Sequence, residues 1–340
     1  MSNMLVGVEG IARKVKAMYI GVDGIARKVK KGYVGVDGVA RCFYSGDHIV
    51  YTGTHTVSSV IDTSGKTRTL YTLTGSGTLT LGQDTEYWMC GGGGCGARAD
   101  DTDGYYTGGG GGGGGYVTSG NLQSGEYIIT IGAGAAYRAV SNGSTPKERA
   151  SSTVISSADS TLYEAGGGYL ANSTYASASY LGRGANGGSG GGAGGAIKDV
   201  SGISFQKGTP GTGDKTNTIP FGIETLYAHS AGGGGGSFYT VEATSPRFGV
   251  GGDGGSNGSN GNNAGWDYEA TDSRAGGSGG VRGGGKGGTA SASGNGTDGS
   301  AATFYGSGGG GGAYSLYGTG PYVNWKKGGA GYQGVVYLLI

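Results

Sequence analysis

Thr107-Gly-Gly-Gly-Gly-Gly-Gly-Gly-Gly-Tyr116 is the longest of several glycine runs in this chain of 340 residues. Further runs occupy 91–94, 166–168, 232–236 and 308–312, and most of the 86 glycines lie beyond residue 90. Glycine has no Cβ, so it loses more backbone entropy on folding than any other residue. Runs of this kind therefore either form a flexible coil or let backbones pack together where no side chain fits.

Short apolar segments interrupt the glycine-rich part and favour order over a coil. They are EYIITI at 126–131, IPFGIETLY at 219–227 and VVYLLI at 335–340, and a flexible Gly/Ser linker has no need of such segments. An extended threefold backbone rises ~3.1 Å per residue and has no internal hydrogen bonds, so its N–H and C=O groups are free to bond neighbouring chains. The sequence therefore predicts an all-β fold in which polyglycine-II-type rods are framed by β-strands.

Residues 1–44 contain a repeat with a period of 14 residues. Val6-Gly-Val-Glu-Gly-Ile-Ala-Arg-Lys-Val-Lys is followed by Ile20-Gly-Val-Asp-Gly-Ile-Ala-Arg-Lys-Val-Lys and by Val34-Gly-Val-Asp-Gly-Val-Ala-Arg. The Glu-Gly or Asp-Gly pair between two β-prone stretches is typical of a hairpin turn. Each copy therefore predicts a β-hairpin, with Val and Tyr on the inward face and Arg and Lys on the outward face.

Two further parts follow the repeat. Residues 45–89 are typical of a small antiparallel β region, in which 67–74 and 78–81 alternate at period two. The Gly75-Ser-Gly77 turn between these segments predicts that they form a hairpin. Residues 90–340 form the third part, a glycine-rich domain.

The charge of the chain is nearly balanced, with 24 Lys and Arg against 23 Asp and Glu. No global field therefore attracts nucleic acid. The basic residues of the N-terminal repeat lack interleaved aromatics or a recognition motif, so we interpret them as charged strand edges or as a surface for an acidic partner protein rather than as a nucleic-acid site.

The sequence contains neither a secretory signal nor the ~18 apolar residues of a membrane span. We expect synthesis in the cytoplasm without a signal peptide, and no membrane insertion.

The chain has three cysteines, Cys42, Cys90 and Cys95. An odd number without a secretory signal argues against a disulfide framework. Cys90 and Cys95 could remain free, close one disulfide or contribute two metal ligands, and a zinc site would need further ligands at a defined spacing. We predict free thiols, with no metal and no cofactor.

Motifs for catalysis are weak. Asp100, Asp101 and Asp103 are typical of a solvated turn, because the position of the twelfth-residue Glu of a calcium loop is occupied by Gly111. Residues 283–289 contain glycines, a Lys and a Thr but not in the order of a phosphate-binding loop. The sequence therefore predicts a protein that is not an enzyme.

Three features of residues 85–340 resemble the glycine-rich domains of bacteriophage tail fibres and tail-tip adhesins. A β-type segment runs into glycines at 86–94, and a long glycine run is followed by a polar turn and an Ile/Val segment closed by Gly-Ala-Gly at 108–134. Glycines then lead into an apolar strand at 328–340. The N-terminal repeat is also similar to segments of prophage structural proteins. The resemblance is one of architecture and does not assign a binding role to any individual residue of this chain.

The resemblance implies a non-enzymatic virion protein of the tail fibre or tail tip, extracellular when functional. The glycine-rich domain, residues 90–340, would be the receptor-binding domain. It would bind a bacterial surface polysaccharide or outer-surface protein through loops between glycine rods. Other tail or baseplate proteins would contact the N-terminal repeats, and fibres of this type are often homotrimers. One alternative is a structural baseplate or fibre spacer without receptor binding, and a less favoured one is an ice-binding or lectin-like protein.

Aromatic side chains between the rods are the candidates for receptor binding, because aromatics provide large contact areas at little entropic cost. The chain has 24 tyrosines, more than a modest core requires. Each of them could instead pack over a neighbouring glycine rod. The candidate residues are Tyr105, Tyr106, Tyr175, Tyr180, Tyr239, Trp266, Tyr268, Tyr314, Tyr317, Tyr322 and Trp325.

Overall fold

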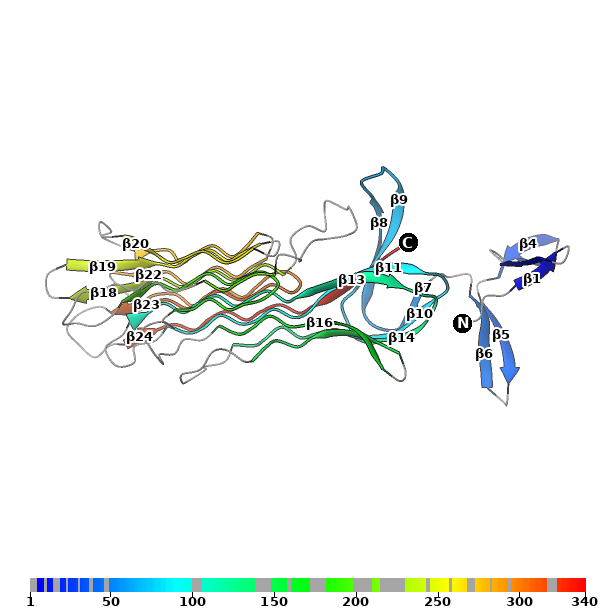
Figure 1. Cartoon of the computed structure of the whole chain (residues 1–340), viewed down its shortest axis with the longest axis horizontal. Helices are drawn as coiled ribbons and strands as arrows, with labels where there is room; N and C mark the ends of the chain where they lie inside the picture. The colour runs from blue at the N-terminus through cyan, green and yellow to red at the C-terminus, as the bar shows by residue number, and fades with distance from the viewer. Residues whose placement is uncertain are drawn as a thin grey trace.

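The computed structural model is elongated, with a β-sandwich between a bundle of extended rods and three β-hairpins (Figure 1). Secondary structure in the described residues consists of β-strands, which confirms the all-β fold. None of these residues belongs to a helix that could cross a membrane. The structure describes residues 5–8, 11–14, 19–22, 24–29, 31–36, 39–45, 49–99, 106–137, 148–157, 160–171, 182–197, 210–214, 230–242, 245–256, 259–267, 273–281, 283–292, 295–316 and 323–340.

The sandwich consists of two five-stranded antiparallel sheets. The first sheet has the order β16 (Thr161–Ala165), β15 (Thr153–Ser156), β14 (Gly125–Thr130), β10 (Gly77–Leu81) and β7 (Ile49–Tyr51). The second has the order β13 (Val117–Leu122), β11 (Thr85–Cys90), β25 (Val335–Leu339), β9 (Thr67–Leu73) and β8 (His55–Ile61).

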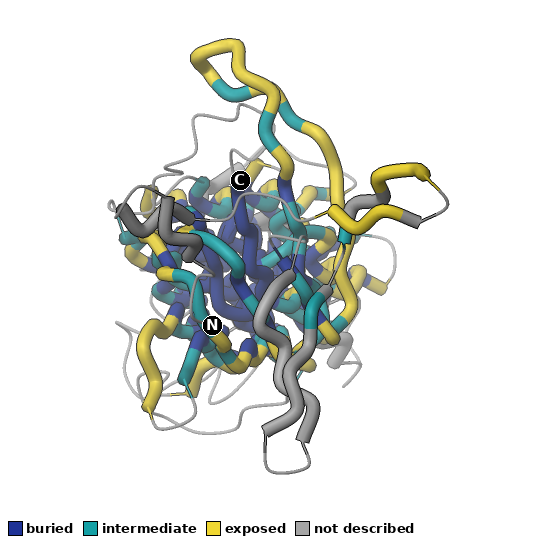
Figure 2. Tube along the Cα trace, turned by 90° about the vertical axis from the view of Figure 1, so that its right-hand side faces the viewer, coloured by how far each residue is buried: buried dark blue, intermediate teal, exposed yellow. Residues whose placement is uncertain are grey.

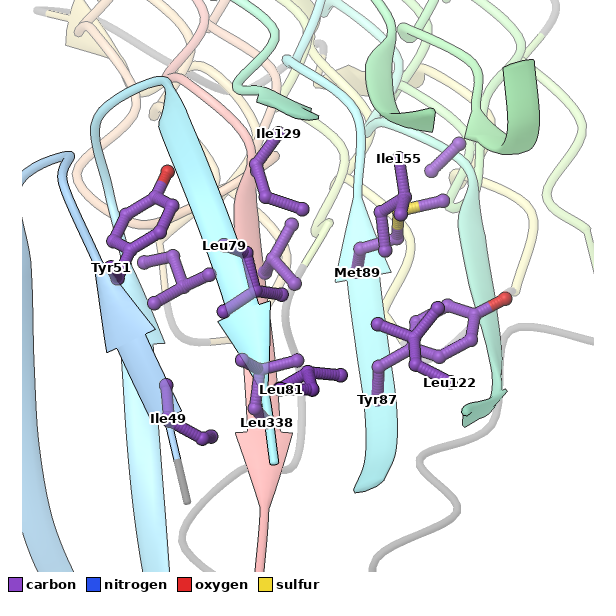
Figure 3. Close-up of a cluster of buried hydrophobic side chains, with 13 residues drawn as sticks. Ile49, Tyr51, Leu79, Leu81, Tyr87, Met89, Leu122, Ile129, Ile155 and Leu338 are labelled. Carbon is purple, nitrogen blue, oxygen red and sulfur yellow. The ribbon is translucent and has the colours of Figure 1, made fainter. Parts of the chain in front are cut away.

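Apolar side chains from both sheets meet in the centre of the sandwich (Figure 3). Leu79 and Leu81 of β10 and Ile129 of β14 lie in the same cluster as Met89 of β11 and Leu338 of β25. All five are at most 1 % exposed. Burial of each such side chain is worth about 1.5–3 kcal/mol, so this cluster holds the two sheets together.

Strands β9 and β10 do not form the hairpin that the turn at Gly75-Ser-Gly77 predicts. They belong to different sheets: β9 pairs with β8 and β25, and β10 pairs with β7 and β14. Leu73 of β9 and Leu79 of β10 are both fully buried and approach the core from opposite sides. The glycine turn therefore connects the two layers, because this is the arrangement that buries the apolar residues of both strands.

The boundary expected at residue 90 does not separate two structural units. Strands β13, β14, β15, β16 and β25 come from the glycine-rich part, yet they complete both sheets of the sandwich. The apolar segments 126–131 and 335–340 correspond to β14 and β25, which confirms that they are strands. Residues 219–227 lie outside the described part of the chain.

The glycine run 108–115 donates hydrogen bonds to three neighbouring segments in strict rotation. The N–H groups of Gly108 and of every third residue after it donate to carbonyl groups of segment 189–195. The N–H groups of Gly109 and of every third residue after it donate to carbonyl groups of segment 306–312. The N–H groups of Gly113 and Tyr116 donate to segment 166–169. A β-strand alternates between two sides, whereas a threefold extended helix presents three. The hydrogen bonding therefore has the period of a polyglycine-II rod.

The carbonyl groups of the same run accept hydrogen bonds with the same period. The donors lie in segments 91–97, 185–188 and 233–236. Run 108–115 is thus surrounded by three runs to which it donates and three from which it accepts. Runs 231–237 and 306–313 bond their own neighbours and each other in the same way, so these three runs form the centre of a hexagonal bundle. Figure 2 shows this buried centre along the long axis.

Side chains are excluded from the centre of the bundle by the closeness of the rods. A Cβ on Gly111 would overlap the carbonyl oxygen of Gly233, and a Cβ on Gly233 would overlap that of Gly309. Rods at the surface carry side chains at every third position instead. Ala275, Ser278 and Val281 are exposed, whereas the glycines between them face inward or sideways. Glycine content along a run thus reflects how many neighbours the rod has.

A second β region caps the end of the bundle opposite the sandwich, here called the distal end (Figure 1). Its five-stranded sheet has the order β20 (Gly265–Asp267), β19 (Ser245–Val250), β18 (Phe238–Glu242), β23 (Tyr314–Leu316) and β24 (Val323–Trp325). Two ribbons accompany it, formed by β12 (Tyr106–Thr107) with β17 (Ala196–Ile197) and by β21 (Ser273–Arg274) with β22 (Ala290–Ser291).

The N-terminal repeat forms three hairpins, as predicted, and the structure shows that all three have the same register. Val6 pairs with Arg13, Ile20 with Arg27 and Val34 with Arg41. The hairpins are β1 (Leu5–Val8) with β2 (Ile11–Lys14), β3 (Tyr19–Val22) with β4 (Ile25–Lys28) and β5 (Lys31–Val36) with β6 (Val39–Ser45).

The predicted separation of apolar and basic residues between the two hairpin faces is wrong. Directly paired residues lie on the same face of a sheet, so Ile20 shares a face with Arg27 and Tyr19 shares the other face with Lys28. Tyr19 and Ile20 are 59 % and 54 % exposed. The reason is the period of two along a strand, which sends neighbouring residues to opposite faces.

Candidate functional site

The distal end brings together the candidate aromatic positions whose backbone is described. Tyr106 lies in β12, Tyr239 in β18, Trp266 in β20, Tyr314 in β23 and Trp325 in β24. The rods run back and forth between the sandwich and this end, so positions far apart in the sequence meet there (Figure 1). The remaining candidates, Tyr105, Tyr175, Tyr180, Tyr268, Tyr317 and Tyr322, lie outside the described residues.

One row of paired residues crosses the whole distal sheet. Trp266 pairs with Gly249, Gly249 with Phe238, Phe238 with Tyr314 and Tyr314 with Trp325. Paired residues lie on one face of a sheet. The register therefore places Trp266 and Trp325 at the two ends of a single aromatic row, each on an edge strand.

Phe238 and Tyr314 occupy the centre of this row and are fully buried. A Cβ on Gly249 would overlap the ring of Phe238, so this ring lies over the glycine of the neighbouring strand. Gly195, where a rod ends, is also close to this ring, since an added Cβ would lie 3.0 Å from it. The aromatic centre of the row therefore joins the sheet to the rods.

Tyr239 lies on the opposite face of the sheet, against Ala290 and Ala313. The β21–β22 ribbon is fixed there by Ser237, whose hydroxyl donates to the carbonyl of Arg274 at 2.7 Å and accepts from the N–H of Ala290 at 2.7 Å. Tyr239 is 4 % exposed as a result.

For Tyr239 and Tyr314 the structure corrects the expectation of receptor binding. Tyr314 is 0 % exposed and Tyr239 nearly so, and a side chain buried to this degree has no surface to offer a ligand. Both fill space where the close-packed rods give way to wider-spaced strands, which is where bulky side chains are needed. Tyr106, Trp266 and Trp325 remain as candidates with a described backbone position.

Two polar residues of the distal sheet were not singled out by the sequence. Asp267 follows Trp266 on β20, and Asn324 precedes Trp325 on β24. Asp267 pairs with Phe248 and Asn324 with Ser315, so both belong to the row next to the aromatic one. Their adjacency to a tryptophan is the signal in the sequence that would have found them.

Cys90 and Cys95, at the start of the rods, are buried thiols that are not joined in a disulfide. Burial raises the pKa of the Cys90 thiol to about 12. Such a thiol stays protonated near neutral pH and is a poor nucleophile or metal ligand. Among the residues that the structure describes, no three His, Cys, Asp or Glu side chains come together as metal ligands would. Asp100, Asp101 and Asp103 lie outside those residues.

Comparison with known proteins adds no family to this description. No family model matches the chain, and no curated protein matches it.

Proposed function

We propose that the chain is a non-enzymatic receptor-binding component of a bacteriophage or phage-like tail, located at the tail fibre or tail tip. Its distal end would bind a polysaccharide or protein of the bacterial surface, outside the cell in which the chain was made. The observation that carries this proposal is the aromatic row of the distal sheet, with Trp266 and Trp325 on its two edge strands. Aromatic residues with adjacent polar groups are frequent in recognition surfaces.

The division of the molecule into two ends supports the same proposal. The rods carry the distal sheet away from the sandwich and the hairpins (Figure 1). The backbone N–H and C=O groups of the rods are occupied by hydrogen bonds between rods. The residues that connect the rods therefore have to provide the specificity for a receptor. A receptor-binding end and an attachment end are the two requirements of a tail adhesin.

The N-terminal hairpins are the part we assign to attachment. Residues 1–44 contain eight Lys and Arg but three Asp and Glu, although the whole chain is nearly neutral. Isolated two-stranded hairpins are only marginally stable in water, and these hairpins expose Tyr19, Ile20 and Ile25. We therefore propose that another tail or baseplate protein, with an acidic surface, covers them. The homotrimer that the resemblance implies stays an expectation.

The test is adsorption of the purified, labelled chain to cells of a candidate host. We expect Trp266→Ala with Trp325→Ala to reduce binding at least tenfold, while the circular dichroism spectrum and melting temperature stay close to those of the wild type. Tyr332→Ala is the matched control, because Tyr332 is 39 % exposed and its ring contacts Tyr305, which packs on the apolar side chains of the sandwich away from the distal end. Binding that survives the double substitution, in a folded protein, contradicts a site on this row.

A structural spacer is the second candidate, and the continuous hydrogen bonding along the rods favours it. A bundle bonded on all sides is suited to transmit force without carrying specificity. Antibodies distinguish the two functions. If an antibody to the hairpins blocks adsorption of the virion and one to the distal end does not, the spacer is the better description.

A further inference from the structure

The hairpin formed by β8 and β9 stands out from the side of the sandwich (Figures 1 and 2). β9 is covered on both edges, since it pairs with β8 and with β25. β8 is the last strand of its sheet, and among the described residues no strand pairs with its other edge. Six of its seven residues are exposed, the exception being Val60.

This edge lacks the features that usually prevent strands from pairing between molecules. Natural edge strands carry lysines, prolines or bulges for this purpose. β8 has the sequence His-Thr-Val-Ser-Ser-Val-Ile, with no Lys, Arg, Asp, Glu or Pro, and its pairing with β9 is regular. Val57 and Ile61 are 52 % and 68 % exposed and lie on one face of the strand.

The backbone of β8 is oriented to accept a further strand. At one end of the hairpin the N–H of Asp62 donates to the carbonyl of Lys66 at 3.0 Å, and at the other the N–H of Thr74 donates to Thr54 at 2.9 Å. Hydrogen-bonded pairs alternate along an antiparallel ladder, so the even-numbered residues of β8 bond β9. The N–H and C=O groups of Val57, Ser59 and Ile61 therefore point to the free edge.

We propose that two copies of the chain associate through this edge, with β8 of one copy antiparallel to β8 of the other. In a twofold contact the same surface serves both partners and must be complementary to itself. A dyad at Ser59 places Val57 of each copy opposite Ile61 of the other, in hydrogen-bonded pairs. It also places Ser58 opposite Val60 on the other face.

The second copy is the occupant that this strand fits best. The exposed apolar residues lie two positions before and two positions after Ser59, so self-pairing brings both together with β-branched partners, a favourable cross-strand combination. No formal charge on β8 opposes the approach of an identical strand. A single pair of strands covers less than the ~1,000 Å² typical of a stable interface, so the dimer should be reversible and depend on concentration.

This contact is independent of receptor binding, because β8 belongs to the sandwich and not to the distal end. It is also twofold, unlike the homotrimer implied by the resemblance. Analytical ultracentrifugation of the full-length protein from ~1 to ~100 μM, a range around a micromolar Kd, measures the association. We expect a monomer that converts to a dimer as the concentration rises.

Ser59→Pro is the decisive variant. The N–H of Ser59 faces the free edge, so proline removes a donor needed between molecules and none needed within the hairpin. We expect this variant to stay monomeric over the whole range, with a melting temperature within a few degrees of the wild type. Ser59→Ala is the matched control and should dimerise like the wild type.

A cross-link tests the position of the dyad. Hydrogen-bonded antiparallel pairs have Cα atoms about 5.5 Å apart, within the range that a disulfide spans. Ser59→Cys should therefore give a covalent dimer under mild oxidation, whereas Ser64→Cys in the hairpin turn should not. A wild type that stays monomeric throughout, an oligomer whose size Ser59→Pro leaves unchanged, or equal cross-linking of both cysteine variants overturns the proposal.

Discussion

Gly112 and Gly233 lie on two different rods and are joined directly, since the N–H of Gly233 donates to the carbonyl of Gly112 at 2.9 Å. The preceding residue, Gly111, approaches the carbonyl of Gly233 so closely that a Cβ would overlap it. A net hydrogen bond is worth about 0.5–1.5 kcal/mol, whereas ordering one backbone residue costs about 1–2 kcal/mol. The bundle is therefore stable only while nearly all these bonds are made together.

Substitution Gly111→Ala should destabilise the protein by about 1–3 kcal/mol, the usual cost of forcing extra atoms into a packed interior. The added methyl group would push apart two of the three central rods and lengthen several of their hydrogen bonds. Urea unfolding followed by circular dichroism measures the loss. The matched control is Gly125→Ala in β14, where the nearest atom to an added Cβ is 3.6 Å away. Equal stability of the two variants would contradict close packing at Gly111.

The rates of amide hydrogen exchange should differ between the rods and the hairpins. The N–H groups of runs 108–115 and 231–237 are bonded in three directions within a buried bundle, so we expect them to exchange only on global unfolding. Hairpin β3–β4 is a two-stranded sheet with exposed residues on both faces, and its amides should exchange within seconds to minutes. Exchange measured by mass spectrometry on peptides covers both parts. Rapid exchange within run 108–115 would show that the rods open locally.

Much of the rod architecture could be predicted from the sequence, because an unbroken run such as 108–115 leaves few other ordered states. The same rule extends to the surface, where Ala275, Ser278 and Val281 repeat every three residues. What the sequence does not contain is which rods are neighbours. The partners of a glycine run are other glycine runs. Because these runs have the same backbone and no side chains, the sequence does not indicate which of them pair.

The sandwich shows a different limit of prediction from the sequence. β25 is a clear apolar strand in the sequence, but its position between β11 and β9 depends on contacts with residues far away in the chain. β9 and β10 have the local pattern of a hairpin and nevertheless lie in opposite layers, because Leu73 and Leu79 are both buried that way. At the distal end, burial of Tyr239 and Tyr314 follows from packing that no local pattern reveals.

Alkaline pH should destabilise the fold. Burial raises the pKa of Cys90 from 9.0 to about 12 and that of Tyr51 from 10.0 to about 12. The folded chain therefore holds these protons more tightly than the unfolded chain, which releases them from about pH 9 upward. The stabilising contribution is complete below pH 9 and falls progressively towards pH 12. Urea midpoints at pH 8 and pH 11 measure the loss, and Cys90→Ser should reduce it. A midpoint that does not change with pH would contradict the burial of both groups.

Tyr314→Ala should lower the stability by about 3–5 kcal/mol, the range for removing a buried aromatic side chain. Tyr314 is fully buried and pairs with both Phe238 and Trp325, so its loss leaves a cavity in the middle of the distal sheet. Trp325 is paired with Tyr314 on the edge strand β24, and comparing the urea unfolding of Trp325→Ala with that of Tyr314→Ala distinguishes the edge strand from the core strand. A Tyr314→Ala protein that is as stable as the wild type but no longer adsorbs to cells would return Tyr314 to the receptor-binding surface and contradict its role in the core.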